Sequence, residues 1–309
     1  MTPGADLVFP LISSRRGRTL DVAGSPSRRR GSGNEIASSR PYRRGDAIRL
    51  VDWAASARLS TARGTDEFVV RDHFAEDAVR VVVVADRSPS MALFPNWLPW
   101  LDKPAAVHEA LRMIIASGST VNALIGAAAV GGTAPPIVPM RRDRAHWRAI
   151  EDCLSVGGTA DGPPDSLDQA LELLSRTART VPAGTFVFVL SDFLPPPSRD
   201  RLTDALAAGW DIVPVIVQDP VWERSFPNVS GVTLPLADPD SGTLSLVRLS
   251  RKETRAQREL NEQRAAHLDV TLRELELDPV TITSSDRGAV HAAFLAWADG
   301  RRNRPRGYR

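Results

Sequence analysis

Short apolar runs alternate with amphipathic stretches along most of the chain after residue 77. The runs "VVVVA" (81–85) and "FVFVL" (186–190) contain no polar residue at alternate positions, which is typical of strands buried on both faces of a parallel sheet. Between them, apolar residues recur at helical spacing, as in residues 104–117 and 166–177. Strands that alternate with helices of this length predict an α/β fold with a doubly wound, mostly parallel sheet.

The same patterns give the approximate limits of the elements. The predicted strands are residues 80–85, 121–130, 137–140, 185–192, 211–217 and 280–283, and the predicted helices are residues 104–117, 144–154, 166–177, 199–208, 252–277 and 288–298.

The chain before residue 77 has a different character. Residues 13–40 are rich in Ser, Gly and Arg and poor in large apolar side chains, which favours a mobile segment. Residues 40–72 are denser in apolar residues, and short strands and a small helix both fit their pattern. We therefore expect four parts: a flexible basic arm (1–39), a small lobe packed on the main domain (40–76), the α/β domain (77–300) and a basic tail (301–309).

Charge is distributed unevenly along the chain. The formal net charge is only +2, but residues 1–58 hold eleven arginines against five acidic residues. This segment either meets an acidic partner or nucleic acid, or pairs with carboxylates of the main domain. No aromatic residues alternate with Arg28–Arg30 as in a nucleic-acid-binding motif, so we expect no nucleic-acid partner.

Other features indicate a soluble protein of the cytoplasm. Cys153 is the single cysteine, which excludes a disulfide framework and fits a reducing compartment. No basic residue precedes the first apolar patch, as a signal peptide would require. The most membrane-like window, residues 113–131, is interrupted by polar residues, so we expect no membrane span.

Polar side chains follow two of the predicted strands, and another lies in the stretch before the predicted helix at 166–177. Asp86, Ser88 and Ser90 follow the first strand, Asp192 follows the strand at 185–191, and Thr159 lies in the glycine-containing stretch "VGGTAD". The carboxyl ends of parallel strands share one edge of the sheet, where ligands bind. Carboxylate and hydroxyl oxygens are ligands that hard cations prefer. The sequence therefore predicts a site for Mg²⁺, or for Ca²⁺ or Mn²⁺, at this edge.

These loops resemble those of a von Willebrand factor A domain, whose metal-ion-dependent adhesion site (MIDAS) carries the motif D-x-S-x-S. The resemblance implies that Ser88 and Ser90 bind the cation directly, that one aspartate acts through water, and that an acidic side chain of a partner completes the coordination. The insertion "ADGPPD" after the threonine loop departs from the pattern and makes Thr159 the least secure ligand. The alternative is a domain of the same fold whose polar loops bind no metal.

A second stretch carries another resemblance. "RPYRRGDAIRLVDWAASARL" (40–59), followed by "EFVVRDH", is similar to the signature of a bacterial family that combines a von Willebrand A-like domain with a neighbouring MoxR-type AAA+ ATPase. The likeness extends from residue 40 to about residue 301. One branch of the family, the MxaS-like branch, accompanies methanol oxidation genes, and the length of this chain suits that branch.

The signature stretch also has a direct interpretation. Arg43, Arg44 and Asp46 lie close in sequence to Trp53. They fit either a guanidinium–carboxylate network that supports a small lobe or a protein-binding face, since Arg and Trp are favoured at interfaces. Trp97 and Trp100, after the first metal loop, fit either a docking surface or partial burial under the following helix.

Together these features predict a non-catalytic adaptor that brings an unknown client protein to a MoxR-type AAA+ ATPase during maturation or assembly of a complex. The ATPase would be a separate chain, because no G-x-x-x-x-G-K-[ST] loop occurs. One alternative is a metal-dependent hydrolase or phosphatase with Asp86 as nucleophile, and another, kept because of the uneven charge, is nucleic-acid binding through the basic N-terminal arm. We expect no enzyme activity, because no histidine lies near the metal loops in sequence to act as acid or base.

Overall fold

The structure is a computed structural model. It describes residues 7–13, 26–43, 48, 51–64, 67–76, 78–92, 101–131, 136–154, 162–177, 181–231, 233–237 and 244–303. The chain forms two compact units. Unit 1 comprises Met1–Arg15 and Arg80–Arg309, and unit 2 comprises Arg16–Val79.

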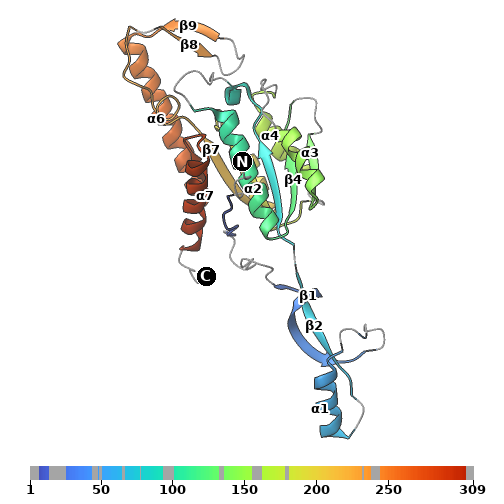
Figure 1. Ribbon diagram of the computed structural model, residues 1–309. Helices are drawn as coiled ribbons and strands as arrows, with labels where there is room; N and C mark the ends of the chain where they lie inside the picture. The colour runs from blue at the N-terminus through green and yellow to red at the C-terminus, as the bar shows by residue number, and fades with distance from the viewer. Residues whose placement is uncertain are drawn as a thin grey trace. The chain divides into compact units, whose positions relative to one another are not determined.

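Unit 1 is built on a mostly parallel sheet (Figure 1). Within the described part of the chain, the strand order is β10-β7-β6-β3-β4-β5, and only β5 runs antiparallel to its neighbour. The α/β class and the mostly parallel sheet predicted from the sequence are therefore confirmed. The strands are β3 (Arg80–Ala85), β4 (Leu124–Ala128), β5 (Ile137–Arg141), β6 (Phe186–Ser191), β7 (Asp211–Val217) and β10 (Val280–Ile282).

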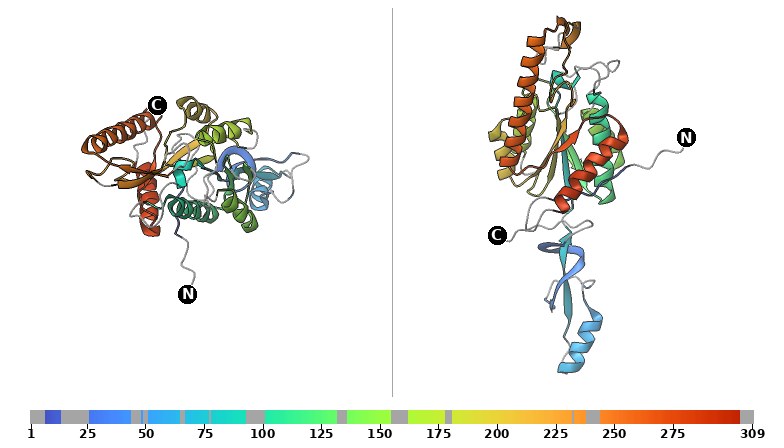
Figure 2. Two further views of the ribbon diagram at one scale, coloured as in Figure 1. Left: turned by 90° about the horizontal axis from the view of Figure 1, so that it is seen from above. Right: turned by 90° about the vertical axis from the view of Figure 1, so that its left-hand side faces the viewer.

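Helices cover both faces of this sheet (Figures 1 and 2). On one side α4 contacts β3 and α5, and α5 contacts β7, whereas α2 and α7 contact each other on the other side. The helices of unit 1 are α2 (Lys103–Thr120), α3 (Arg144–Leu154), α4 (Ser166–Arg176), α5 (Arg199–Ala207), α6 (Arg251–Glu274) and α7 (Arg287–Arg302).

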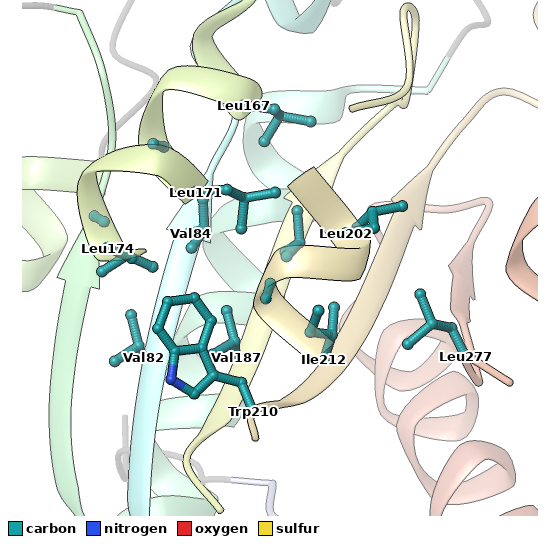
Figure 3. Close-up of a cluster of buried hydrophobic side chains, with 14 of the residues drawn as sticks. Val82, Val84, Leu167, Leu171, Leu174, Val187, Leu202, Trp210, Ile212 and Leu277 are labelled. Carbon is teal, nitrogen blue, oxygen red and sulfur yellow. The ribbon is translucent and has the colours of Figure 1, made fainter. Parts of the chain in front are cut away.

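The alternation of side chains along the strands fills a core on each face of the sheet. Val82, Val84 and Val187 point toward α4 and α5, where they pack around the fully buried Trp210 (Figure 3). The Trp210 indole nitrogen donates to the carbonyl of Val181 at 3.0 Å, so its polar atom is satisfied inside the core. Each large apolar side chain buried here contributes roughly 1.5–3 kcal/mol.

The opposite face includes a segment from the start of the chain. Phe9 is buried, and its ring stacks on Phe294 of α7 with 4.3 Å between centroids. Its amide donates to Ser117 Oγ of α2 at 2.9 Å. A flexible arm over residues 1–39 therefore does not describe residues 7–13, because the Phe9 side chain completes the core of unit 1.

The far end of the chain also differs from its expected description. A basic tail was expected from residue 301, but α7 includes Arg301, whose buried guanidinium pairs with Asp211 at 3.1 Å and contacts the Trp297 ring. A basic side chain can be buried in this way when a carboxylate and an aromatic face receive it.

Unit 2 contains strands and a helix. The sequence left both possibilities open for residues 40–72, but the strand Pro26–Pro41 lies mostly within residues 13–40, which were expected to form a mobile segment. β1 (Pro26–Pro41) pairs antiparallel with β2 (Val69–Glu76), and α1 covers Trp53–Arg63. The helix begins where the Asp52 carboxylate accepts from the amide of Ala55 at 3.1 Å, and it ends at Gly64, whose φ of 64° suits glycine.

A hairpin precedes the long helix of unit 1, and the sequence patterns did not reveal it. β8 (Thr233–Ala237) and β9 (Leu244–Arg248) pair antiparallel outside the main sheet, close to the start of α6 (Figure 1). α6 begins with a capping box, in which Ser250 and Glu253 exchange side-chain and backbone hydrogen bonds. None of the described helices is both long and apolar enough to cross a membrane.

Candidate functional site

The strand order reverses between β3 and β6. From β3 the chain crosses to β4 on one side, and it later returns to β6 on the other side of β3. Ligands bind at such a reversal, outside the carboxyl ends of the strands. Asp86 follows β3 and Asp192 follows β6, and the amide of Asp86 donates to the carbonyl of Leu190 at 2.9 Å. The structure thus brings the two predicted aspartates to the same edge of the sheet.

The Asp86 carboxylate is buried and receives three hydrogen bonds. Oδ1 accepts from the amide of Ser88 and from Ser166 Oγ, both at 2.8 Å, and Oδ2 accepts from Ser191 Oγ at 2.6 Å. These three donors, a backbone amide and two serine hydroxyls, are uncharged. Ser166 and Ser191 were not predicted from the sequence, although Ser166 begins α4 and Ser191 ends β6.

Ser88 and Ser90 also lie together. Their side-chain oxygens are 3.0 Å apart, and both residues are buried. The short helix η2 (Pro89–Ala92) begins between them and turns the chain away from β3. The two serine hydroxyls therefore lie side by side, and the backbone amide of Ser88 is bound to the buried Asp86 carboxylate.

Lys103, at the start of α2, lies in the same region. Its ammonium group donates to Asp192 Oδ2 at 2.8 Å and to the carbonyl of Ser90 at 3.0 Å, and it pairs with Glu223. The side chain is only 1% exposed. No feature of the local sequence marks this lysine, because its partner Asp192 is 89 residues away.

Asp192 is therefore engaged by groups of the protein itself. Besides Lys103 at Oδ2, the amide of Leu194 donates to Oδ1 at 2.9 Å. Its carbonyl accepts from Gln218 Nε2 at 2.6 Å. Asp192 lies at the predicted place, but its carboxylate binds an ammonium group, so a cation would have to compete with Lys103 for it.

Glu223 extends the cluster from the segment after β7. Its second carboxylate oxygen accepts from the amide of Asp219 at 2.8 Å, and the Asp219 carboxylate accepts from the amide of Leu101 at 2.9 Å. These bonds join the segment before α2 to the segment after β7. Sequence reasoning missed Glu223 because only the fold brings residues 101–103 and 219–223 together.

The electrostatics of the site reflect several carboxyl groups in a buried place. Burial raises the pKa of Asp86, and the negative charge of Asp192 raises it further, against the opposing effect of its hydrogen bonds. Burial and the charge of Asp192 raise the pKa of Glu223 to about 7, although Lys103 opposes this. Burial alone would lower the pKa of Lys103, but the charges of Asp192 and Glu223 outweigh it and raise the pKa. The cluster thus favours added positive charge.

Thr159 lies outside the described residues. On either side of it, Cys153 and Gly162 both contact Arg87: the Arg87 guanidinium donates to the carbonyl of Cys153 at 3.2 Å, and the Arg87 carbonyl accepts from the amide of Gly162 at 2.9 Å. A Cβ at Gly162 would lie 2.8 Å from the Arg87 carbonyl and 2.7 Å from that of Val130. Only glycine fits this close approach.

The donor set has the chemistry that a hard dication requires. The paired hydroxyls of Ser88 and Ser90 lie beside the Asp86 carboxylate, whose partners are uncharged, and oxygen ligands suit Mg²⁺. Within the described ranges, no group of three or more His, Cys, Asp or Glu side chains is arranged to hold a metal ion. A cation here would therefore depend on the serine hydroxyls.

The residues expected to bind partners lie only partly within the described chain. Arg43 is exposed, and Trp53 is 61% exposed. The Trp53 ring meets Phe68 edge-to-face at 6.0 Å, and Phe68 in turn contacts Tyr42. Three exposed aromatic rings thus form one surface of unit 2. The other residues of this prediction, Arg44, Asp46, Trp97 and Trp100, lie outside the described residues.

Comparisons with known proteins give a family and no activity. A family model described as "Protein of unknown function DUF58" matches residues 38–268. Uncharacterized proteins of Mycobacterium bovis and Mycobacterium tuberculosis are 29% identical over 215 residues, which is 69% of this chain and 63% of theirs. The chain therefore spans less than two thirds of the length of these relatives.

Solved structures show only a weak likeness. The conserved hypothetical protein BatB from Bacteroides thetaiotaomicron is 14% identical, with a TM-score of 0.39, and an aerotolerance-related membrane protein from Bacteroides fragilis is 12% identical, also with a TM-score of 0.39. Each likeness covers 72% of this chain and 100% of the other. At these scores neither structure informs the function of this chain.

Proposed function

Since the chain belongs to the DUF58 family, which is described as of unknown function, we propose a function from the site itself: a non-catalytic, metal-dependent adaptor. Unit 1 is a von Willebrand factor A-like domain with a MIDAS-type site at the Asp86 edge. The adaptor presents a bound cation to an acidic side chain of a client and works with a MoxR-type AAA+ ATPase in the maturation or assembly of a complex. A role in methanol oxidation is one form of this proposal.

The observation that carries the proposal is the hydroxyl pair of Ser88 and Ser90 beside Asp86. Both hydroxyls are buried at the reversal point of the sheet, where open α/β folds bind ligands. Mg²⁺ or a similar dication, when bound, would supply positive charge for an anionic partner. The two serines would hold it, and Thr159 is proposed as a further ligand.

The two aspartates act in different ways in this proposal. Asp86 orients the serine loop by accepting from the amide of Ser88, and its negative charge attracts the cation. Asp192 is bound to Lys103, so it contributes charge at a distance rather than a direct bond. Both roles follow from the hydrogen bonds that hold each carboxylate in place.

The surroundings of Asp86 favour binding over catalysis. Within the described part of the chain, its carboxylate contacts a backbone amide and two serine hydroxyls. A nucleophilic carboxylate needs an acid or base close to the reacting group, and none of these donors has a pKa suited to that role. A hydrolase remains the second possibility, and turnover of a phosphate ester by the intact protein would favour it.

The aromatic surface of unit 2, defined by Tyr42, Trp53 and Phe68, is proposed as the contact for the ATPase. Exposed aromatic rings with arginine nearby are frequent anchors of protein interfaces. Trp53 and Phe68 are well exposed, and Arg43 follows Tyr42 in the chain. This surface belongs to unit 2 and the cation site to unit 1, so the proposal assigns the ATPase and the client to different units.

The double substitution Ser88→Ala/Ser90→Ala tests the cation site. It removes both serine hydroxyls proposed as ligands and leaves the hydrogen bonds of the Asp86 carboxylate, including that from the Ser88 amide, in place. Asp86→Ala would be a poorer test, because it leaves the donors of three buried hydrogen bonds without an acceptor. Titration of the full chain with MgCl₂ or MnCl₂ in a calorimeter should show one binding event in the wild type and none in the double variant.

Ser119→Ala serves as the matched control. Ser119 lies near the end of α2 opposite to Lys103, and its hydroxyl donates to the carbonyl of Ile115. This variant should bind the cation as the wild type does, and capture of the client, but not of the MoxR-type ATPase, should depend on Mg²⁺ in both proteins. Equal client capture by the wild type in Mg²⁺ and in EDTA would contradict the metal-dependent mechanism.

A further inference from the structure

Lys103 is a buried cation next to the proposed metal ligands. Its ammonium group contacts Asp192, Glu223 and the carbonyl of Ser90. These acceptors match the three donors that an ammonium group carries. Lysine is rarely buried to this extent unless it is paired, and here the pairing is with two carboxylates that approach from different parts of the chain.

The position of Lys103 is set firmly by the start of α2. Asp102 caps the helix by accepting from the amide of Ala105 at 3.0 Å, and Pro104 follows in the first turn. The preceding amide, that of Leu101, donates to Asp219. The backbone on both sides of Lys103 is therefore fixed, and the ammonium group is directed at the carboxylates of Asp192 and Glu223.

Ser90 links this ammonium group to the proposed cation site. Its carbonyl accepts from Lys103, and its hydroxyl is paired with that of Ser88. A cation bound at the two serines would be repelled by the positive charge of Lys103. The Asp192 oxygen that accepts from Lys103 could also not bind that cation directly. Both effects weaken the binding of a dication.

A purely structural role predicts something different. If Lys103 only joined α2 to the segments after β6 and β7, its loss would lower stability, because Asp192 and Glu223 would be left buried without a partner. It would not improve the binding of anything. A gain in cation affinity on removal of the lysine is therefore specific to competition with the metal.

We propose that Lys103 is an internal counter-ion that withholds Asp192 from the cation and so sets the affinity of the Asp86–Ser88–Ser90 site for divalent ions. The inference rests on the proposed cation site. It makes Lys103 a positioning residue, which keeps the site weak enough for the ion to exchange and leaves the bound ion dependent on an anionic group of the client.

The test compares cation binding by full-length Lys103→Met and wild type, with MnCl₂ as the probe in calorimetry. The substitution keeps most of the side-chain volume and removes the charge. Loss of the ammonium charge and release of Asp192 should tighten Mn²⁺ binding by about tenfold or more. Addition of Mn²⁺ should also raise the thermal unfolding temperature of the variant more than that of the wild type.

Two further variants control this result. Lys103→Arg keeps the positive charge and should bind Mn²⁺ about as the wild type does, whereas Lys103→Met/Asp192→Asn should lose the gain in affinity. If Lys103→Met does not fold, Lys103→Met/Glu223→Gln removes one charge of each sign and still releases Asp192, so it should bind more tightly than the wild type.

The outcomes separate this inference from the proposed function. Tighter binding by the lysine variant with no binding by the wild type would support the inference and overturn the metal-dependent adaptor. Wild-type binding that neither lysine-to-methionine variant improves would overturn the inference and leave the adaptor standing. Tighter binding that persists in Lys103→Met/Asp192→Asn would also overturn it, because Asp192 would then have no part in the effect.

Discussion

Glu223 shows how a single residue at the sheet edge couples charge to stability. It shares the Lys103 ammonium group with Asp192, and it is buried. Two buried carboxyl groups that share one ammonium group cannot both ionise without a cost in free energy. For this reason the pKa of Glu223 rises to about 7 in the folded protein, with burial as the largest cause and the charge of Asp192 as a further one.

This raised pKa predicts a pH dependence of stability that Glu223→Gln should reduce. The folded state binds more protons than the unfolded state between the ordinary glutamate pKa of 4.5 and about 7. Stability from this group is therefore fully present below pH 4.5 and is lost as the pH rises through 7. Over that window we expect the free energy of unfolding to fall by on the order of 2 kcal/mol in the wild type.

Urea unfolding at a series of pH values between about 4 and 8, a range that spans the two pKa values, measures this effect. Glu223→Gln should show a shallower decline, whereas Glu259→Gln, at an exposed residue of α6 that pairs with Arg255, should keep the wild-type slope. Identical slopes in all three proteins would mean that Glu223 does not retain a proton in the folded state.

The candidate site was only partly predictable at the residue scale. Asp86, Ser88 and Ser90 could be found because they stand together in sequence, directly after an apolar run. Lys103 and Glu223 could not be found in this way, since each reaches this edge of the sheet from a different part of the chain. The engagement of Asp192 by Lys103 spans 89 residues, and no local pattern encodes a contact of that range.

At the scale of elements, Gly162 marks the point where the segment before α4 approaches the Asp86 loop. Its amide donates to the carbonyl of Arg87, and any Cβ would lie under 3.0 Å from two carbonyl oxygens. Gly162→Ala should therefore force the two segments apart and lower the free energy of unfolding by about 1–3 kcal/mol. Because Arg87 lies between Asp86 and Ser88, the variant should also bind Mg²⁺ more weakly.

Gly300→Ala is the matched control for Gly162→Ala. Gly300 is exposed in α7, and nothing lies within 4 Å of the place where its Cβ would stand. Alanine there should raise stability by about 0.5–1 kcal/mol through helix propensity. Urea titration of both variants measures the contrast, and a Gly162→Ala variant as stable as the wild type would show that the two segments can separate without cost.

Element prediction from sequence succeeded where periodicity was strong and long. β3, β6 and β7 each contain an uninterrupted apolar run of at least five residues, and α3 begins and ends where the pattern predicted. The β8–β9 hairpin was missed, because it pairs outside the main sheet and Leu246 in it is 77% exposed. A strand that buries little has no clear alternation for sequence reasoning to detect.

At the scale of the whole molecule, unit 1 is built from two separate stretches of the chain. Residues 7–13 pack in unit 1, the chain then forms unit 2, and it returns to unit 1 at Arg80. Composition alone placed the first residues in a flexible arm, because the adjoining segment from residue 13 is rich in Ser, Gly and Arg. A few apolar side chains within a polar region gave too weak a signal, since their partners in α7 lie nearly three hundred residues away.

If residues 7–13 are part of the core of unit 1, Phe9→Ala should destabilise it strongly. The ring is 3% exposed, stacks on Phe294 and meets Trp297 edge-to-face at 5.9 Å. Its removal should leave a cavity between α7 and the sheet and lower the free energy of unfolding by about 3–5 kcal/mol.

Val8→Ala tests whether that loss comes from the Phe9 ring itself. Val8 is 40% exposed, and its contact with His291 is made by its backbone carbonyl, so the substitution should change stability by less than about 0.5 kcal/mol. Urea unfolding of the full chain, followed by far-UV circular dichroism and tryptophan fluorescence, measures both variants. An arm that does not pack would leave Phe9→Ala as stable as Val8→Ala. A large difference between them requires that the first residues of the chain complete a domain whose remaining sequence begins at residue 80.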